Sequence, residues 1–182
     1  MALCLSFGLG ASADSMAVPA GRQITLLLKV LTYDRQLEAK AGNDLVIGVV
    51  SVPTDAESAK ASEQVQKTLY AFRGKTVKKL PLDFFVHDYT DPEKLEAWVK
   101  RHSIDIVYLA PGNQSNVAAI VAVARRLKLT TVTGVPAYVE KGVAVGIGER
   151  RSKPQILINL TSARQEGSDF DSSLLRIATV IK

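Results

Sequence analysis

The chain has 182 residues, of which 47% are hydrophobic and 23% are charged, and its formal net charge is +5. This length suits one domain with a substantial core, and the composition is typical of an ordinary globular protein. Basic residues are scattered and do not alternate with aromatic residues along a stripe, which argues against a nucleic-acid-binding surface. The sequence contains no internal repeat and no low-complexity segment, so neither a solenoid nor a disordered protein is indicated.

The N-terminus has the pattern of a cleaved export signal. The opening residues, MALCLSFGLGASADS, are apolar and small, and Ala-Ser-Ala at 11–13 matches a signal peptidase motif directly before Asp14. We therefore expect a signal peptide over 1–13, a single domain over 14–182 and export of the protein. Because the basic start of an ordinary signal is missing, an N-terminal extension is the alternative interpretation.

The first half of the chain predicts helices and strands in alternation. Residues 24–39, ITLLLKVLTYDRQLEA, carry two apolar stripes and predict a helix covered on more than one side. The apolar run at 45–51 predicts a strand buried on both faces. A helix capped by Thr54-Asp55 and ended by Gly74 follows, and then a strand over 82–89.

The second half continues this alternation. Asp91 begins a helix that has proline in its first turn, and residues 104–110 predict a buried strand. Residues 112–115 lead into another apolar-striped helix, and a short strand follows at 130–134. Alternation with connections of this length predicts a parallel sheet with right-handed crossovers.

The end of the chain departs from that alternation. Strands over 143–150 and 153–160 are separated by only a few residues and predict an antiparallel hairpin. A final helix is expected over 170–181, with one apolar face docked on the sheet. The expected fold class is α/β, in three layers: a flavodoxin/Rossmann-like, mostly parallel sheet with the first strand central, a C-terminal antiparallel hairpin and a terminal helix.

The strand-end loops contain the candidate ligand-binding residues, because ligands of open α/β sheets bind beyond the carboxyl ends of the strands. The rule brings together loops 51–55, 87–89, 110–116 and 133–136. In the third, APGNQSN, a glycine lets the backbone approach a ligand, and N–H groups at a helix start attract carboxylate or phosphate. The candidates for a small anionic ligand are Ser51, Thr54, Gly112, Asn113, Gln114 and Ser115. The alternative is that Asn113 or Ser115 only caps the following helix.

No group of residues indicates catalysis. His87 precedes Asp88 at a strand end, but adjacent strand residues point to opposite faces and are poorly placed to act together. With only His87 and His102 in the chain, a histidine-based metal centre is not expected. Neither Ser51 nor Ser115 lies in a nucleophile-elbow motif. We therefore expect no enzyme activity, no catalytic residue, no metal and no cofactor.

One apolar stripe of the N-terminal helix is the candidate protein-binding surface. It consists of Leu26, Val30, Tyr33 and Leu37, and contact with one sheet does not require a second stripe. The same stripe would serve equally for contact with a partner domain or with a second copy of the chain. Both a protein partner and a homodimer therefore stay open.

Several motifs occur in an order that resembles one family. Towards the C-terminus these are Lys153-Pro154 before an apolar strand ending at Asn159, then Ser162-Ala163-Arg164, Gly167, and Ser173-Leu174-Leu175 with Ala178. Earlier segments in matching order are LLLKVLTYDRQL, DIVYLAPG and YVEKGVAVGI. Over most of residues 22–181 the chain thus resembles the YfiR-like family of small exported bacterial proteins.

The resemblance implies a regulatory role. The best-understood member is periplasmic and represses an inner-membrane diguanylate cyclase by binding its periplasmic domain. This chain is accordingly expected to be an exported periplasmic regulatory binding protein that acts on a membrane-bound signalling partner such as a diguanylate cyclase. That member's redox control relies on cysteines and is not expected here, because no cysteine follows Cys4. Since wider relatives resemble half of a substrate-binding protein, the alternative is a single-lobe periplasmic small-ligand-binding protein related to ABC transporter components.

Overall fold

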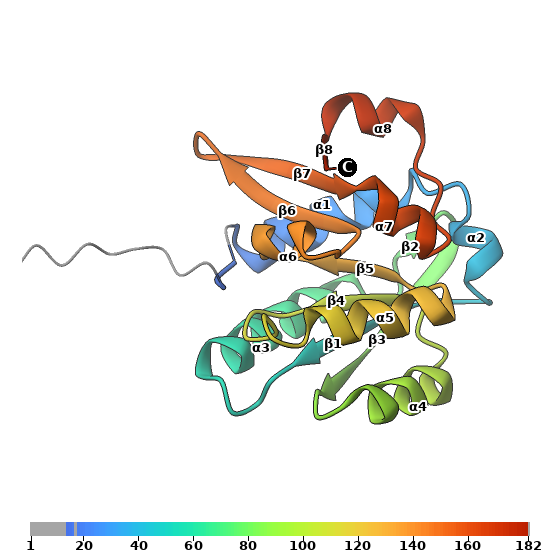
Figure 1. Cartoon of the computed structure of the whole chain (residues 1–182). Helices are drawn as coiled ribbons and strands as arrows, with labels where there is room; N and C mark the ends of the chain where they lie inside the picture. The colour runs from blue at the N-terminus through green and yellow to red at the C-terminus, as the bar shows by residue number, and fades with distance from the viewer. Residues whose placement is uncertain (1–13, 17, 182) are drawn as a thin grey trace, which may run out of the picture.

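The structure is a computed structural model that describes residues 14–16 and 18–181 (Figure 1). The predicted signal peptide over 1–13 lies outside the described residues. Within the described part of the chain, the strands form one eight-stranded sheet with the order β2-β3-β1-β4-β5-β6-β7-β8. None of the helices in that part has the length and apolar character needed to cross a lipid bilayer.

Parallel strands form the centre of the sheet. In spatial order they are β3 (Leu80–Asp88), β1 (Leu45–Ser51), β4 (Ile106–Leu109), β5 (Thr130–Thr133) and β6 (Val145–Arg150). The chain therefore starts in the middle, extends to one side and then fills the other, which is the predicted flavodoxin-like arrangement. The hairpin of β6 with β7 (Lys153–Asn159) is antiparallel, as predicted.

Alternation of side chains along β1 explains the helices on both sides of the sheet (Figure 1). Leu45, Ile47 and Val49 belong to a core shared with α1 (Ala20–Leu31) and α3 (Ala56–Phe72). Val46 and Val50 belong to the opposite core, which is shared with the helices α4 (Pro92–His102), α5 (Val117–Leu127) and α6 (Pro136–Glu140). The α/β class and the three layers are thus confirmed.

The predicted helix over 24–39 is broken into two. Helix α1 ends at Leu31, and α2 (Leu37–Lys40) begins after a turn. The cause is Asp34, whose Oδ1 accepts hydrogen bonds from the backbone N–H groups of Gln36 (3.0 Å) and Asp169 (2.9 Å). In a continuous helix the Gln36 N–H would instead bond the backbone carbonyl of Thr32, four residues earlier.

The predicted helix over 170–181 is shorter in the structure and a strand follows it. Helix α8 (Ser172–Ile177) begins after Asp171, which caps it by accepting from the Ser173 backbone N–H at 2.8 Å. Residues Thr179–Ile181 form β8, which pairs in parallel with β7. Without β8 the edge of β7 would expose unpaired backbone N–H and C=O groups. Thr179, Val180 and Ile181 are all β-branched and favour a strand, which pairs with these groups, over another helical turn. The structure also contains α7 (Leu160–Gln165) and a short strand, β2 (Thr76–Val77), that were not predicted.

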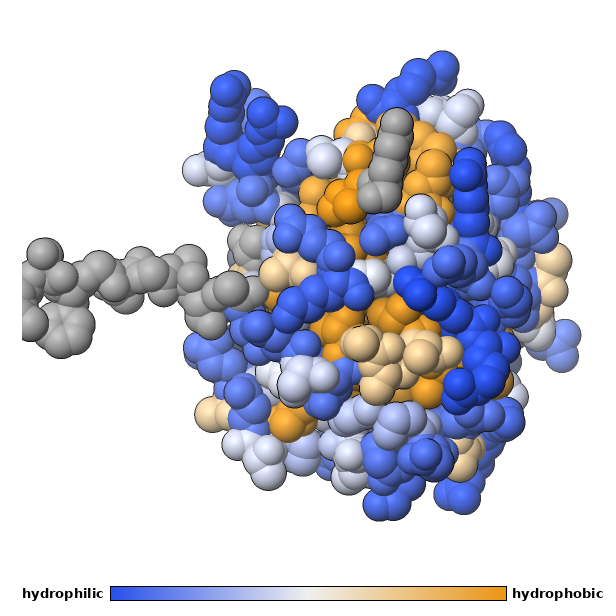
Figure 2. Space-filling model, viewed as in Figure 1, coloured by the Kyte–Doolittle hydropathy of each residue, from blue (hydrophilic) through white to orange (hydrophobic). Residues whose placement is uncertain are grey.

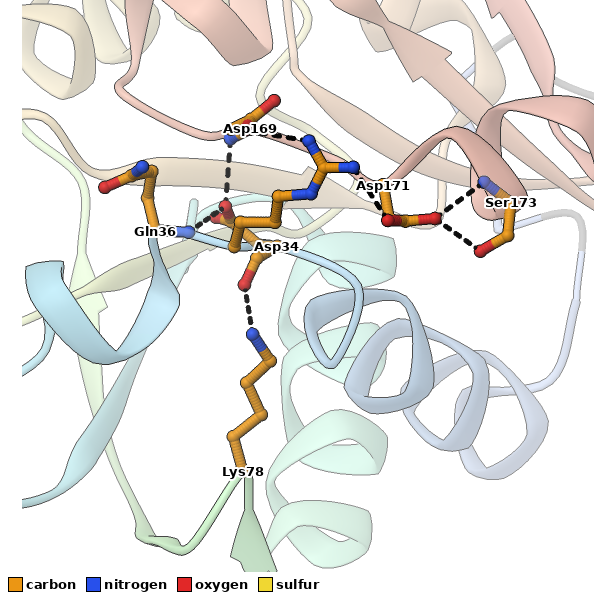
Figure 3. A network of polar contacts seen from close by, with 7 residues as sticks. Asp34, Gln36, Lys78, Asp169, Asp171 and Ser173 are labelled. Carbon is orange, nitrogen blue, oxygen red and sulfur yellow. Dashed lines mark hydrogen bonds and ion pairs between the residues drawn. The ribbon is translucent and has the colours of Figure 1, made fainter.

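Polar contacts join the α1–α2 turn to the C-terminal segment (Figure 3). Asp34 is fully buried, and the Arg35 guanidinium lies 2.8 Å from an Asp171 carboxylate oxygen and 3.4 Å from one of Asp169. From the other side, the Lys78 Nζ donates to the backbone carbonyl of Asp34 at 2.6 Å. Three distant segments of the chain therefore meet at this turn.

A second buried carboxylate, that of Glu166, follows α7. Its oxygens accept from the backbone N–H (2.8 Å) and the hydroxyl (2.7 Å) of Thr131 on β5. Burial raises the pKa of Glu166 to about 7, although the Thr131 hydrogen bonds and the charges of Lys40 and Arg125 act in the opposite direction. The folded protein therefore holds this proton more tightly than the unfolded chain does.

The raised pKa of Glu166 predicts a pH-dependent stability. The contribution of protonated Glu166 to the unfolding free energy is fully present below the unfolded pKa of 4.5. It is lost as the pH rises to about 7. We expect wild type to lose on the order of 3 kcal/mol of unfolding free energy across that window, and Glu166→Gln to lose much less. Urea unfolding at a series of pH values measures this, with Glu140→Gln on the exposed end of α6 as control. The prediction would be contradicted if the unfolding free energy of Glu166→Gln and that of wild type changed equally with pH.

The half-buried Asp105 has a pKa that burial raises to about 6. It contributes equally to the pH dependence of both proteins.

Candidate functional site

The carboxyl ends of β1, β4 and β5 lie beside one another at one edge of the sheet, and most of the predicted ligand-binding residues lie there. Ser51 is the last residue of β1 and is buried, and its hydroxyl donates to Asp88 at 3.4 Å. Thr54 lies in the loop after β1 and is exposed. These two residues therefore do not share one environment.

The loop between β4 and α5 packs tightly against the start of α3. Gly112 has a φ of +83°, and a Cβ at this position would lie 2.8 Å from the Cβ of Ser58 and 3.1 Å from the Asp55 carboxyl carbon. Only glycine therefore fits both the backbone conformation and the space. Asp55 is held in place because it caps α3, as predicted, by accepting from the Ser58 backbone N–H at 2.7 Å.

Asn113 holds this loop on the sheet. Its side chain is fully buried and donates to the backbone carbonyls of Val50 (3.1 Å) and Ala110 (3.0 Å). The alternative prediction, that the side chain of Asn113 or Ser115 caps α5, is wrong because the N-cap is Asn116 and no side-chain cap hydrogen bond forms. Gln114 and Ser115 are exposed. Of the predicted residues in this loop, Gly112 and Asn113 shape the site, and the other two lie at its surface.

An acidic residue that was not predicted completes the site. One carboxylate oxygen of Asp14, Oδ2, accepts from the Gly112 backbone N–H at 3.1 Å, and the other, Oδ1, accepts from the Tyr138 hydroxyl. Tyr138 is fully buried in α6, which follows the carboxyl end of β5. Burial raises the pKa of Tyr138 well above its usual value, and the Asp14 carboxylate acts in the same direction. The hydroxyl thus stays protonated and able to donate.

The chain that follows Asp14 is anchored at several points. The Met16 sulfur accepts from the Tyr108 hydroxyl at 3.4 Å, and Val18 is 2% exposed. The buried Gln23 accepts from the same Tyr108 hydroxyl and donates to the Val18 carbonyl at 3.2 Å. We call residues 14–16 and 18 the N-terminal strap.

A pocket of about 210 Å³ lies beside the strap. It is lined by Ser15, Met16, Glu57, Lys60, Ala61, Gln64 and Pro111. The lining therefore combines apolar atoms with one acidic and one basic side chain of α3. A small polar molecule is the kind of ligand that such a lining suits.

His87 and Asp88 make separate contacts at the end of β3. The His87 ring stacks on Trp98 with the ring centroids 4.8 Å apart, whereas Asp88 accepts from Ser51. Burial lowers the pKa of His87, although the charges of Asp88 and Asp91 act in the opposite direction. The two side chains are thus engaged with different partners.

The predicted protein-binding stripe is divided by the fold. Val30 and Leu37 are fully buried in the core with α1 and α3, so the prediction that they form a surface is wrong. Leu37 lies seven residues after Val30, and both side chains are buried although a turn separates α1 from α2. Leu26 and Tyr33 are partly exposed, and the Lys29 ammonium lies 5.6 Å from the centre of the Tyr33 ring.

Apolar side chains also reach the surface around the C-terminal strand. Figure 2 shows orange side chains gathered near the end of the chain, over the outer strands β7 and β8. Ile177, at the end of α8, is 70% exposed. This outer edge of the sheet is therefore a second apolar area of the surface.

Comparison with known families decides the relationship of this chain. Residues 23–179 match the YfiR/HmsC-like family, from α1 to the start of β8. The chain belongs to the YfiR/HmsC-like family. Membership supports a role as a periplasmic regulator. A search of curated proteins finds no significant match to this chain.

Solved structures show what else this YfiR/HmsC-like chain is similar to. A conserved domain protein from Vibrio cholerae has a TM-score of 0.63 at 16% identity, with 90% of this chain and 60% of that chain covered. An ABC domain in complex with L-Trp from Streptococcus pneumonia has a TM-score of 0.61 at 15% identity, with the same coverage of 90% and 60%. A substrate-binding protein with adhesive properties from Clostridium difficile, in its ligand-free, open structure, has a TM-score of 0.53 at 16% identity, covering 81% and 57%. The chain thus spans about 60% of the first two structures, and the likeness shows a shared fold.

Proposed function

We propose that this protein is an exported periplasmic regulator that controls a membrane-bound signalling protein, such as a diguanylate cyclase, by direct contact. The observation that carries the proposal is the family match over residues 23–179, which includes all the central strands and both helical layers. The protein acts by presenting a surface and carries out no reaction of its own.

Two measurements test this role. Deleting the gene should raise cyclic di-GMP in the cell, because a repressor of synthesis is removed. The purified protein should also bind the purified periplasmic domain of at least one membrane diguanylate cyclase from the same genome. Unchanged cyclic di-GMP together with no binding to any of these domains would reject the proposal.

The two partly exposed residues of the stripe, Leu26 on α1 and Tyr33 just after it, form the proposed contact surface. Leu26→Glu combined with Tyr33→Glu should weaken partner binding at least about tenfold, because charge replaces apolar contact at the centre of an interface. Binding is measured by calorimetry, and circular dichroism checks the fold. Thr25→Glu, on the exposed side of the same helix, is the matched control. Full affinity in the folded double variant would place the contact elsewhere.

A second candidate function is binding of a small ligand by this single lobe. The specific observation that favours it is the pair of donors, Gly112 and Tyr138, that already holds a carboxylate at the carboxyl edge of the sheet. This edge is where open α/β sheets bind ligands. A thermal-shift screen against carboxylates, phosphate and amino acids tests it, and no stabilisation by any of them would count against it.

A further inference from the structure

The Asp14 carboxylate lies in a site that the rest of the fold builds. Its two oxygens meet donors from two different segments, the Gly112 backbone N–H and the Tyr138 hydroxyl. The loop of Gly112 is held by the buried Asn113 side chain, and Tyr138 is itself fully buried. Neither donor depends on Asp14 for its position.

This arrangement matches the chemistry of a carboxylate. One planar group offers two acceptor oxygens, and each donor here serves a different oxygen. Hydrogen bonds to an ionised acceptor are stronger than neutral ones, and the buried setting of Tyr138 strengthens them further. A free carboxylate of the same shape would make both contacts equally well.

We propose that this site binds the carboxylate of a small free molecule, an amino acid or a short organic acid, and that Asp14 is a tethered competitor for it. The inference rests on the second candidate function and names its ligand class. Cleavage after Ala13, which the sequence predicts, would leave Asp14 in the mature chain. The competitor would therefore remain after such cleavage.

The pocket beside the strap offers space for the remainder of such a ligand, because Ser15 and Pro111, the chain neighbours of Asp14 and Gly112, line it. Its volume of about 210 Å³ is below the roughly 300 to 1,000 Å³ of ordinary ligand pockets, so the ligand is small. Glu57 and Lys60 on its wall offer partners for an ammonium or a second carboxylate. Because Ser15 and Met16 form part of the same wall, a ligand that displaces Asp14 also shifts the strap and enlarges the pocket.

The test compares ligand binding with and without the tethered carboxylate in the full chain. Asp14→Ala should bind acetate, succinate and L-alanine at least about tenfold more tightly than wild type, because a tethered group competes at a high effective concentration. Calorimetry measures the affinities, and acetamide replaces acetate to show that the charge is needed. Asp44→Ala removes one exposed acidic group elsewhere and controls for net charge.

A second variant assigns the gain to this site. Asp14→Ala combined with Tyr138→Phe should lose the gained affinity while keeping its fold, as thermal unfolding checks. In wild type, acetate should also shift the NMR signal of the Gly112 amide. The inference would be overturned if Asp14→Ala bound these ligands no more tightly than wild type and acetate did not shift the Gly112 amide signal. Stabilisation by inorganic phosphate alone would overturn it too while leaving the second candidate function standing, and cyclic di-GMP measurements test the regulatory role separately.

Discussion

Leu37→Asp is expected to unfold the protein or to lower its unfolding free energy by at least about 4 kcal/mol. Leu37 is fully buried in the core beside α1 and α3, where a carboxylate would lose its hydration among apolar side chains. Domains of this size are stable by only about 5 to 15 kcal/mol, so one such change removes much of the total.

Ala39→Asp is the matched control for this prediction. It places the same charge two residues further along α2, where the side chain is exposed, and should change stability by less than about 1 kcal/mol. Urea unfolding followed by circular dichroism measures both variants. A stable, folded Leu37→Asp protein would show that this residue lies at the surface, as the apolar stripe had predicted.

Asp34→Ala is expected to lower the unfolding free energy by about 3 kcal/mol, because it leaves two backbone N–H groups without their acceptor. Those groups belong to Gln36 and Asp169. The hydrogen bond from Asp169 connects the turn after α1 to the C-terminal segment across 135 residues. Hydrogen exchange of the Asp169 amide should accelerate together with the loss of stability.

Asp34→Asn separates hydrogen bonding from charge at this position. The amide oxygen keeps both contacts, and the amide nitrogen takes the place of Oδ2, which has no hydrogen-bond partner among the described residues. We expect its stability to lie within about 1 kcal/mol of wild type. If Asp34→Asn is as unstable as Asp34→Ala, the charge of Asp34 and not its accepted hydrogen bonds stabilises the turn.

Local signals predicted much of the fold. The uninterrupted apolar run of β1 predicted a central strand, and Asp55 and Asp91 predicted the starts of α3 and α4, where both side chains cap the helix. The short connection between β6 and β7 predicted their antiparallel pairing. Each of these features depends on residues that are close together in the sequence, so their pattern is sufficient.

The candidate site was predicted only in part. The loop containing Gly112 and Asn113 was identified because strand ends meet at one edge of a parallel sheet. Asp14 was not identified, since 98 residues separate it from Gly112 and nothing in its neighbourhood indicates the contact. Tyr138 follows one of the predicted strand-end loops, but the direction of its hydroxyl depends on the packing of α6.

By itself, the sequence determined the α/β class, the alternation of strands and helices, and the family to which the chain belongs. Only the tertiary structure decided where the first helix bends, that the described chain ends in a strand, and that an acidic residue near the N-terminus fills the carboxyl-edge site. The physical reason is the range of the interactions. Caps and apolar periodicity act over a few residues, whereas Asp34 with Asp169 and Asp14 with Gly112 form only after the sheet has brought distant segments together.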